Sequence, residues 1–245
     1  METIKLKING IEVTAPKGST ILEAARLAHI EIPTLCFLKE INEIGACRVC
    51  IVELKNGKLV TSCVYPAEDG MEVFTNTPKV MDSRKKTIQL LLSNHNRSCL
   101  SCVRSGHCEL QELARELGVE DEGYYDGETT PSEIDTSAAH MIRDNSKCIL
   151  CRRCVAVCSE VQGIGVIGAN NRGFATEIGS AFGMGLGETS CVSCGQCIAV
   201  CPTGALQEKD CTSEVFAAIA DPSKHVIVQT APAVRAALGE EFGLP

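Results

Sequence analysis

The chain has 245 residues, 44% of them hydrophobic, and a net charge of −8, and this length can bury a core in one domain or two. The acidic balance and the lack of a basic run argue against nucleic-acid binding, and no apolar run reaches the roughly 18 residues of a membrane-spanning helix. Residues 1–8 lack the pattern of a secretory signal, so we expect a soluble, cytoplasmic protein with no direct membrane insertion.

The first predicted elements are a hairpin and a helix. Residues 4–13 alternate between polar and apolar side chains around Asn9-Gly10, a pair typical of a tight hairpin turn. Ser19-Thr20 suits the N-cap of a helix over residues 21–29, which Pro33 closes.

A second hairpin is predicted further along the chain. Residues 51–54 and 58–61 flank Asn56-Gly57, and residues 71–74 predict an additional strand. Two hairpins around one helix indicate a small mixed sheet with a helix across it, an α+β arrangement.

Two further helices precede a connecting segment. Thr77-Pro78 predicts the start of a helix that runs to about Asn94, with Val80, Met81, Ile88, Leu91 and Leu92 at its apolar positions. Residues 109–117 predict another helix, ended by Gly118. Residues 120–135 are acidic and contain Gly, Thr, Ser and Pro, which indicates a surface connection between modules.

Cysteine is the unusual component of this composition. Sixteen cysteines with no Trp and 4% aromatic residues indicate small modules in which bound metal contributes part of the folding free energy. A disulfide framework is the alternative, but the spacings described next are those of cluster ligands.

The first ligand set is Cys36, Cys47, Cys50 and Cys63, with ten, two and twelve residues between successive members. A close pair in a loop plus two distant thiolates is the general plan of a plant-type 2Fe-2S site, although that type has four residues in its first gap. Gly45-Ala46 suits a loop whose N–H groups approach sulfide. A four-cysteine zinc site remains the alternative.

The second ligand set is His95, Cys99, Cys102 and Cys108, with three, two and five residues between successive members. One imidazole and three thiolates suit a structural zinc site equally well, so the residues alone leave the metal open. His107 competes for the histidine role, but it adjoins Cys108, and neighbouring side chains have difficulty in reaching one metal together.

The third and fourth sets form a doubled motif. Cys148, Cys151, Cys154 and Cys158 repeat the two-two-three spacing of Cys191, Cys194, Cys197 and Cys201, which is typical of bacterial two-cluster ferredoxins. In that pattern the fourth cysteine crosses to the other cluster. We therefore expect one 4Fe-4S cluster on Cys148, Cys151, Cys154 and Cys201, and another on Cys158, Cys191, Cys194 and Cys197. Pro202 follows the second motif, whereas Ser159 follows the first.

Several other signals carry no function by themselves. Cys211 has no partner motif, which predicts a free buried thiol. Gly163, Gly165 and Gly168 spell a dinucleotide fingerprint, but they lie too close to Cys158 for the strand and helix that it requires. We predict a tight glycine-rich crossing there and at Gly183, Gly185 and Gly187. His29, His140 and His225 have no ligand-like neighbours in sequence, and no catalytic residue is predicted.

The order of the four ligand sets resembles the N-terminal electron-input region of the large subunit of iron-only hydrogenases, including NAD-linked electron-bifurcating ones, and also the large peripheral-arm subunit of complex I. The resemblance covers residues 1–210. It implies that His95 ligates iron, and that the chain binds one 2Fe-2S cluster and three 4Fe-4S clusters.

The resemblance also implies a multi-domain α+β chain with a plant-type ferredoxin-like (β-grasp) domain, a small helical domain with the His/Cys cluster, and a bacterial two-cluster ferredoxin domain. The expected ranges are 1–78, 79–119, a linker at 120–137, 138–210, and a tail at 211–245. The tail resembles the start of a hydrogen-activating domain, but no cysteine follows Cys211 to bind that domain's cluster.

The resemblance implies an electron relay in a soluble hydrogenase-type or transhydrogenase-type complex. FMN and NAD(P) are expected on a partner subunit, with a small 2Fe-2S subunit and soluble ferredoxin as further partners. The alternatives are the input part of a hydrogenase, a subunit of a complex I-like or formate dehydrogenase, and a zinc-scaffolded interaction protein.

Overall fold

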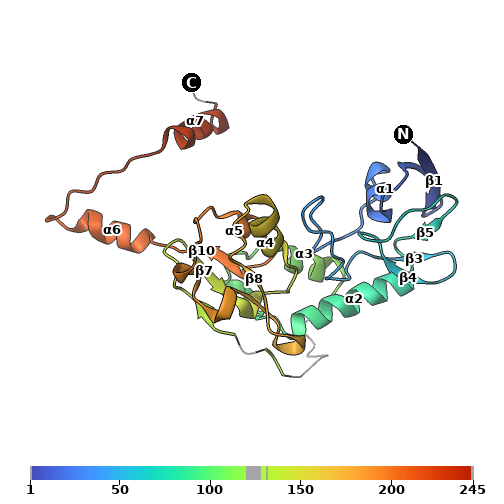
Figure 1. Cartoon of the computed structure of the whole chain (residues 1–245), viewed down its shortest axis with the longest axis horizontal. Coiled ribbons are helices and arrows are strands. Elements are labelled where there is room, and N and C mark those ends of the chain that lie inside the picture. Colours follow the sequence, from blue (N-terminus) through green and yellow to red (C-terminus); the bar gives the residue numbers. More distant parts are fainter. Residues whose placement is uncertain (1, 120–127, 131, 244–245) are drawn as a thin grey trace. The chain divides into compact units, whose positions relative to one another are not determined.

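The computed structural model describes residues 2–119, 128–130 and 132–243. The chain divides into two compact units, Met1–Glu208 and Lys209–Pro245, and all four predicted ligand sets belong to the first (Figure 1).

A five-stranded mixed sheet forms the N-terminal part of the first unit. Its strand order is β2-β1-β5-β3-β4, with β1 parallel to β5 and the other pairs antiparallel. Asn9 and Gly10 turn the first hairpin with φ of 52° and 82°, the left-handed conformation that a tight hairpin turn requires. The strands are β1 (Thr3–Ile8), β2 (Ile11–Pro16), β3 (Ile51–Leu54), β4 (Leu59–Thr61) and β5 (Glu72–Phe74).

Helix α1 (Ile21–Leu27) packs against this sheet and begins with a capping box. Thr20 Oγ1 accepts a hydrogen bond from the Glu23 N–H at 3.2 Å, and the Thr20 N–H donates to the Glu23 carboxylate at 2.9 Å. These two bonds satisfy N–H groups that have no partner inside the helix. The helix ends two residues before the predicted limit, and its apolar face is buried in the core of the sheet.

Helix α2 (Pro78–Ser93) runs from the sheet toward the middle of the first unit (Figure 1). Thr77 caps it as predicted, because its hydroxyl oxygen accepts from the Val80 N–H at 3.2 Å. Val80 and Ile88 are fully buried, whereas Met81 is 38% exposed, so the predicted apolar face is only partly used. Helix α3 (Glu109–Glu116) packs beside α2.

The rest of the first unit consists of short elements around the doubled cysteine motif. One sheet has the order β10-β7-β6, and β8 pairs with β9. Strand β6 lies inside the range predicted as a linker, of which residues 120–127 and 131 lie outside the described residues. The elements are β6 (Ile134–Asp135), β7 (Met141–Asp144), α4 (Arg153–Ala156), β8 (Gly168–Asn170), β9 (Glu177–Gly179), α5 (Gln196–Ala199) and β10 (Leu206–Glu208).

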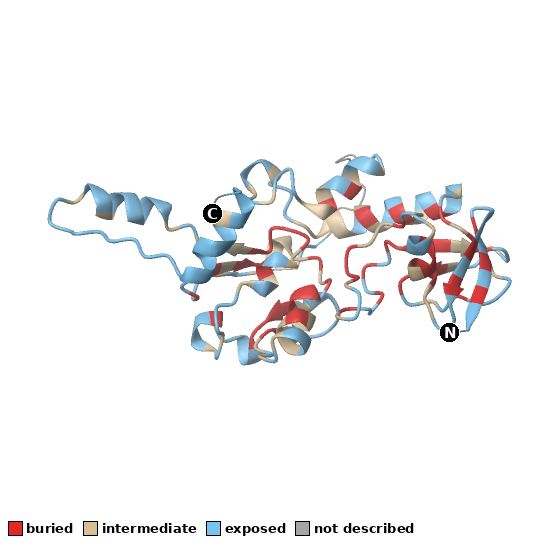
Figure 2. Cartoon of the chain, turned by 90° about the horizontal axis from the view of Figure 1, so that it is seen from above, coloured by how far each residue is buried: buried red, intermediate tan, exposed pale blue. Residues whose placement is uncertain are grey.

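Two helices, α6 (Thr212–Ala220) and α7 (Pro232–Glu241), form the second unit. Neither has a buried residue, and Figure 2 shows the second unit almost entirely in the colour of exposed residues. Cys211 precedes α6 and is half-buried, so the prediction of a buried thiol is wrong. In the described part of the chain, no helix is long and apolar enough to cross a membrane.

Candidate metal centres

The four cysteines of the first set are buried where two loops meet the N-terminal sheet. Cys36 follows α1, Cys47 and Cys50 precede β3, and Cys63 follows β4. Their exposed fractions are between 1% and 6%. The Cys47 N–H points at Cys36 Sγ from 3.5 Å, whereas the approach of backbone N–H groups to sulfide stays a prediction.

The thiols of the first set form two hydrogen-bonded pairs. A bond to the Cys36 thiol lowers the pKa of Cys47, and a bond to the Cys63 thiol lowers the pKa of Cys50. The same bonds raise the pKa of the two donating thiols. The site therefore favours two thiolates, the form of cysteine that ligates metals.

Arg84 of α2 anchors this ligand loop, and sequence analysis missed it. The side chain is 5% exposed, donates from Nη2 to the Ile51 carbonyl at 2.7 Å and from Nε to the Val49 carbonyl at 3.2 Å. Burial lowers the pKa of the guanidinium, and the nearby Cys50 opposes this effect. From sequence, an arginine in the second turn of a helix is expected on the protein surface. No local sequence pattern therefore predicts that Arg84 is buried.

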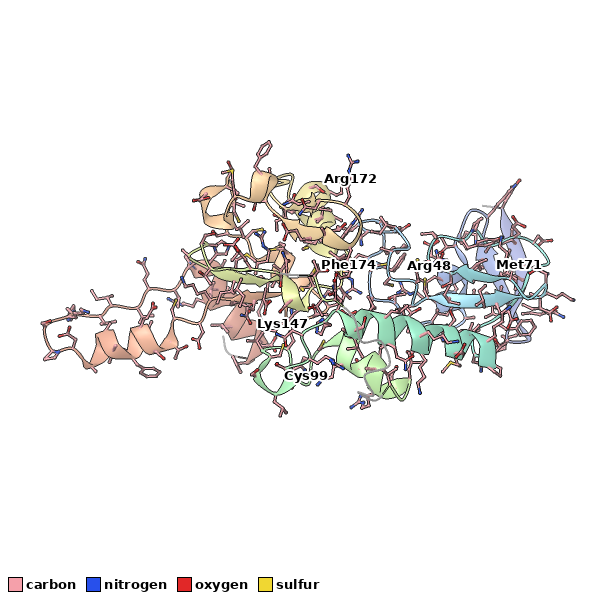
Figure 3. All side chains as sticks on the ribbon, turned by 90° about the horizontal axis from the view of Figure 1, so that it is seen from below. Arg48, Met71, Cys99, Lys147, Arg172 and Phe174 are labelled. Atoms are coloured by element: carbon pink, nitrogen blue, oxygen red, sulfur yellow. The ribbon has the colours of Figure 1, made fainter. Side chains whose placement is uncertain are left out.

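The second set lies at the end of α2 and in the loop that follows it, where Figure 3 labels Cys99. The His95 Nδ1 atom is buried and has no hydrogen-bond partner among the residues that the structure describes. Burial lowers the pKa of this imidazole, and the positive charge of Lys147 adds to the effect. A neutral imidazole with an unsatisfied buried nitrogen fits a metal ligand. His107, by contrast, is exposed.

Gly204 brings the doubled-motif region against the second set. A Cβ atom at this position would lie 2.5 Å from Cys102 Sγ. Polar contacts also join these two regions. The Glu109 N–H donates to the Pro202 carbonyl at 3.1 Å, and Arg104 Nη2 donates to the Ile198 carbonyl at 2.9 Å. Arg153 forms a bidentate ion pair with Glu109 at 2.6 and 2.9 Å.

The backbone repeats along with the doubled cysteine motif. Leu150 and Arg152 flank Cys151 with φ of 54° and 61°, and Ser193 and Gly195 flank Cys194 with φ of 57° and 72°. Arg152 and Gly195 then begin α4 and α5. Non-glycine residues rarely adopt positive φ, so two equivalent loops with this conformation indicate equivalent tasks.

Two cavities divide the eight cysteines of the doubled motif. One is lined by Cys148, Cys151, Cys154 and Cys201, and the other by Cys158, Cys191, Cys194 and Cys197. Each cavity thus takes three cysteines from one motif and the last cysteine of the other. Their remaining walls include the apolar residues Ile149, Ile178, Ile164 and Ile167.

The predicted glycine-rich crossing lies beside the second cavity. Gly163 and Gly165 have positive φ, and the N–H groups of Ile164 and Gly165 both donate to the Cys158 carbonyl, at 2.9 and 3.1 Å. The chain reverses tightly here and holds Cys158 in place. The structure thus uses these glycines for a turn beside a ligand residue.

Two polar residues near the cysteines escaped sequence analysis. His140 places Nε2 3.9 Å from Cys191 Sγ and Nδ1 3.0 Å from Ser193 Oγ, although nothing in its sequence neighbourhood is ligand-like. Asn42 donates to the carbonyls of both Cys36 and Cys151, at 2.7 and 3.0 Å. The contacts of His140 with Cys191 and of Asn42 with Cys151 join residues far apart in the chain, so only the tertiary structure reveals them.

Burial keeps the thiols around the first cavity in their neutral form as long as no metal is bound. Burial raises the pKa of Cys148 to about 11 and that of Cys151 to about 12, and it raises that of Cys154 as well. Positive iron would offset the cost of burying several thiolates together. Within the described ranges, no three His, Cys, Asp or Glu side chains gather around a single-ion position.

Three family models match successive parts of the chain. A 2Fe-2S iron-sulfur cluster binding domain matches residues 1–78, the iron-sulfur binding region of NADH-ubiquinone oxidoreductase G matches 84–122, and a 4Fe-4S dicluster domain matches 147–205. These ranges contain the first set, the second set and the doubled motif, respectively.

The curated proteins that are similar to this chain include a hydrogenase subunit and a hydrogenase. The NADP-reducing hydrogenase subunit HndD of Solidesulfovibrio fructosivorans is 48% identical over all of this chain and 43% of its own length. Iron hydrogenase 1 of Clostridium pasteurianum is 37% identical over 97% of this chain and 42% of its own length. The chain thus spans less than half the length of these curated relatives.

One solved structure is similar to this chain over most of the length of both. A chain in the crystal structure of an NAD+-reducing [NiFe]-hydrogenase in the H2-reduced state has a TM-score of 0.78 and 31% identity, over 84% of this chain and 87% of that one. This chain therefore belongs to the family of iron-sulfur electron-transfer proteins found in NAD(P)-linked hydrogenases, iron hydrogenases and complex I.

Proposed function

We propose that this chain relays electrons through one 2Fe-2S cluster and three 4Fe-4S clusters, from a flavin- and NAD(P)H-oxidising partner to ferredoxin or another redox partner. The grouping of all four ligand sets within one compact unit is the observation that carries the proposal. Iron-sulfur clusters supply one-electron redox chemistry at potentials set by cluster type, hydrogen bonds to sulfur and solvent exposure.

Each ligand set has a separate place in this proposal. The 2Fe-2S cluster is held by Cys36, Cys47, Cys50 and Cys63, and the His-ligated 4Fe-4S cluster by His95, Cys99, Cys102 and Cys108. The crossing arrangement, supported by the lining of the two cavities, assigns Cys148, Cys151, Cys154 and Cys201 to the third cluster. The fourth is then held by Cys158, Cys191, Cys194 and Cys197.

Apolar packing connects these sites. One core combines Cys36, Cys47 and Cys151 with residues of α2 and α3, and a second surrounds Cys154. Such packing excludes water from the ligand loops and brings them close together, which electron transfer between clusters requires. The chain's residues therefore act by binding and spacing the clusters, and FMN and NAD(P) belong to a partner subunit in this proposal.

The extent of similarity favours a hydrogenase-type complex over a complex I-type one. The two hydrogenase relatives match 100% and 97% of the chain, whereas the potato mitochondrial NADH dehydrogenase iron-sulfur protein 1 matches 73%. The alignments with the two hydrogenase relatives therefore include residues of the C-terminal tail. We infer that the electrons serve a soluble, NAD(P)-linked and electron-bifurcating assembly, with a small 2Fe-2S subunit as a further partner.

Metal analysis of anaerobically prepared protein tests this function. One two-iron and three four-iron clusters require about fourteen iron atoms per chain and a matching amount of sulfide. Low-temperature EPR of the reduced protein should show one 2Fe-2S signal and several 4Fe-4S signals. Zinc in place of iron, or a colourless and well-folded sample without sulfide, would refute the relay and favour a zinc scaffold.

Copurification from the native host distinguishes the possible complexes. A flavin-containing partner together with NAD(P)H-dependent reduction of ferredoxin is the expected result. A response to quinone or formate would instead assign the chain to a complex I-like or formate-oxidising dehydrogenase.

A further inference from the structure

Asn42 connects two ligand sets that lie in different modules. Its side-chain Nδ2 donates to the Cys36 carbonyl at 2.7 Å and to the Cys151 carbonyl at 3.0 Å. The residue is 3% exposed. Cys36 belongs to the first set and Cys151 to the doubled motif, so one buried amide spans both sites.

The chemistry of both neighbours determines the orientation of the amide. Both partners are carbonyl oxygens, which only accept hydrogen bonds, so the amide nitrogen must face them. An amide NH₂ group has two hydrogens, and the two carbonyls use both of them. Among the standard side chains of this size, only asparagine offers two donors from one neutral atom. Aspartate has the same shape and only acceptors at neutral pH.

The backbone of Asn42 is held independently of its side chain. Leu38 and Asn42 form an isolated antiparallel bridge, in which the Asn42 N–H donates to the Leu38 carbonyl at 2.8 Å and the Leu38 N–H donates to the Asn42 carbonyl at 3.1 Å. This closed loop keeps the side chain aimed at the two cysteines. It also means that a substitution at Asn42 leaves these local backbone bonds in place.

Apolar packing surrounds the two hydrogen bonds of the Asn42 side chain but does not set their direction. Leu35, Cys36 and Val49 from the first module share one buried core with Ile149 and Cys151 from the doubled motif. Such contacts are non-directional, so they bring the two loops together without specifying which backbone groups face each other. The two hydrogen bonds of Asn42 supply a directional restraint at the point where the ligand loops meet.

We propose that Asn42 is a positioning residue that sets the separation of the 2Fe-2S cluster from the 4Fe-4S cluster of the first cavity, an inference that rests on the proposed function. The rate of electron transfer falls steeply as the gap between two redox centres widens. A single side chain bonded to a ligand residue of each centre therefore controls this step without touching either cluster.

The test uses Asn42→Asp and Asn42→Ser in the full chain, prepared anaerobically with all clusters. The carboxylate of Asn42→Asp faces two carbonyl oxygens and repels both, and the hydroxyl of Asn42→Ser has one hydrogen for two acceptors. Asn170→Asp is the matched control, because Asn170 Nδ2 also donates to a carbonyl, that of Ser180 at 2.8 Å, but contacts no ligand residue there.

Three quantities are measured: the iron and sulfide content, the magnetic interaction between the reduced 2Fe-2S and 4Fe-4S clusters, and the rate of electron exchange between them. We expect full iron content in all variants, with the magnetic splitting reduced and the exchange slowed in both Asn42 variants and unchanged in Asn170→Asp. Activity is not needed as a readout.

Three results would overturn the positioning role. A magnetic splitting and a rate of electron exchange equal to those of the wild type in both Asn42 variants would show that the Asn42 side chain does not set the distance between the two clusters. Loss of either cluster in both variants would show that Asn42 serves cluster assembly instead. A wild type with full iron but no interaction between the two clusters would place them too far apart for direct transfer, while leaving the relay function intact; a wild type without iron would refute the function itself.

Discussion

Gly204→Ala tests whether the doubled-motif region is closely packed against the His-ligated site. The added Cβ would lie 2.5 Å from Cys102 Sγ, whereas Lys147 Cδ and Arg104 Cγ, at 3.6 and 3.8 Å, are at ordinary contact distance. Cys102 would have to move by about an ångström to reach ordinary van der Waals separation. Gly204 does not have a positive φ, so backbone strain adds nothing.

We expect Gly204→Ala to destabilise the protein by about 1–3 kcal/mol, the usual cost of overpacking a close contact. Because Cys102 is a proposed ligand, the EPR signal of the His-ligated cluster should weaken while the 2Fe-2S signal remains. Anaerobic urea unfolding and EPR of the reduced protein measure the two effects. Gly168→Ala is the control, since its Cβ would meet nothing within 4 Å. Equal stability and equal spectra in Gly204→Ala and the wild type would refute the close contact.

Four further predictions follow from other contacts. Cys201→Ser should remove the cluster bound by Cys148, Cys151 and Cys154; EPR loss confined to the cluster of the second motif would contradict the crossing assignment. Glu109→Gln should cost roughly 1–3 kcal/mol in urea unfolding, because the Arg153 side chain is 7% exposed and loses its charged partner; the value lies below that of a fully buried pair because Glu109 is 44% exposed. Arg84→Lys should loosen the loop that holds Cys50, seen as faster amide exchange at residues 47–51, since lysine cannot reach both the Val49 and Ile51 carbonyls as a fork; unchanged exchange would exclude this anchoring. Iron removal by a chelator should expose the amides of residues 138–206 to exchange before those of β1 and β2, because the former pack largely around ligand cysteines; simultaneous exposure would contradict it.

Local elements were predictable wherever a short-range rule governs them. Asn9-Gly10 specifies its hairpin turn, and Thr20 and Thr77 specify helix starts, through bonds within three residues. Boundaries were less accurate, as α1 ends at Leu27 instead of His29. The exposed Met81 shows that helical periodicity cannot tell which apolar residue finds a partner, because this depends on what packs against the helix.

The cysteine spacings alone predicted four metal sites, because ligands in one loop must be close in sequence to reach one cluster. The assignment of individual residues to clusters stays a prediction, and so does the division of the chain into modules. The structure divides the chain at Glu208 and orders part of the expected linker as β6, a strand whose partner β7 follows it directly.

By itself, then, the sequence predicted the ligand sets and their order and determined the family resemblance, since these depend on residue types at short spacings. Only the tertiary structure decided which residues connect the sites: Arg84 on the loop of Cys50, His140 beside Cys191, and Asn42 between Cys36 and Cys151. These side chains act across long stretches of chain, where hydrogen bonds form only after the modules have packed together, and no local pattern encodes such a contact.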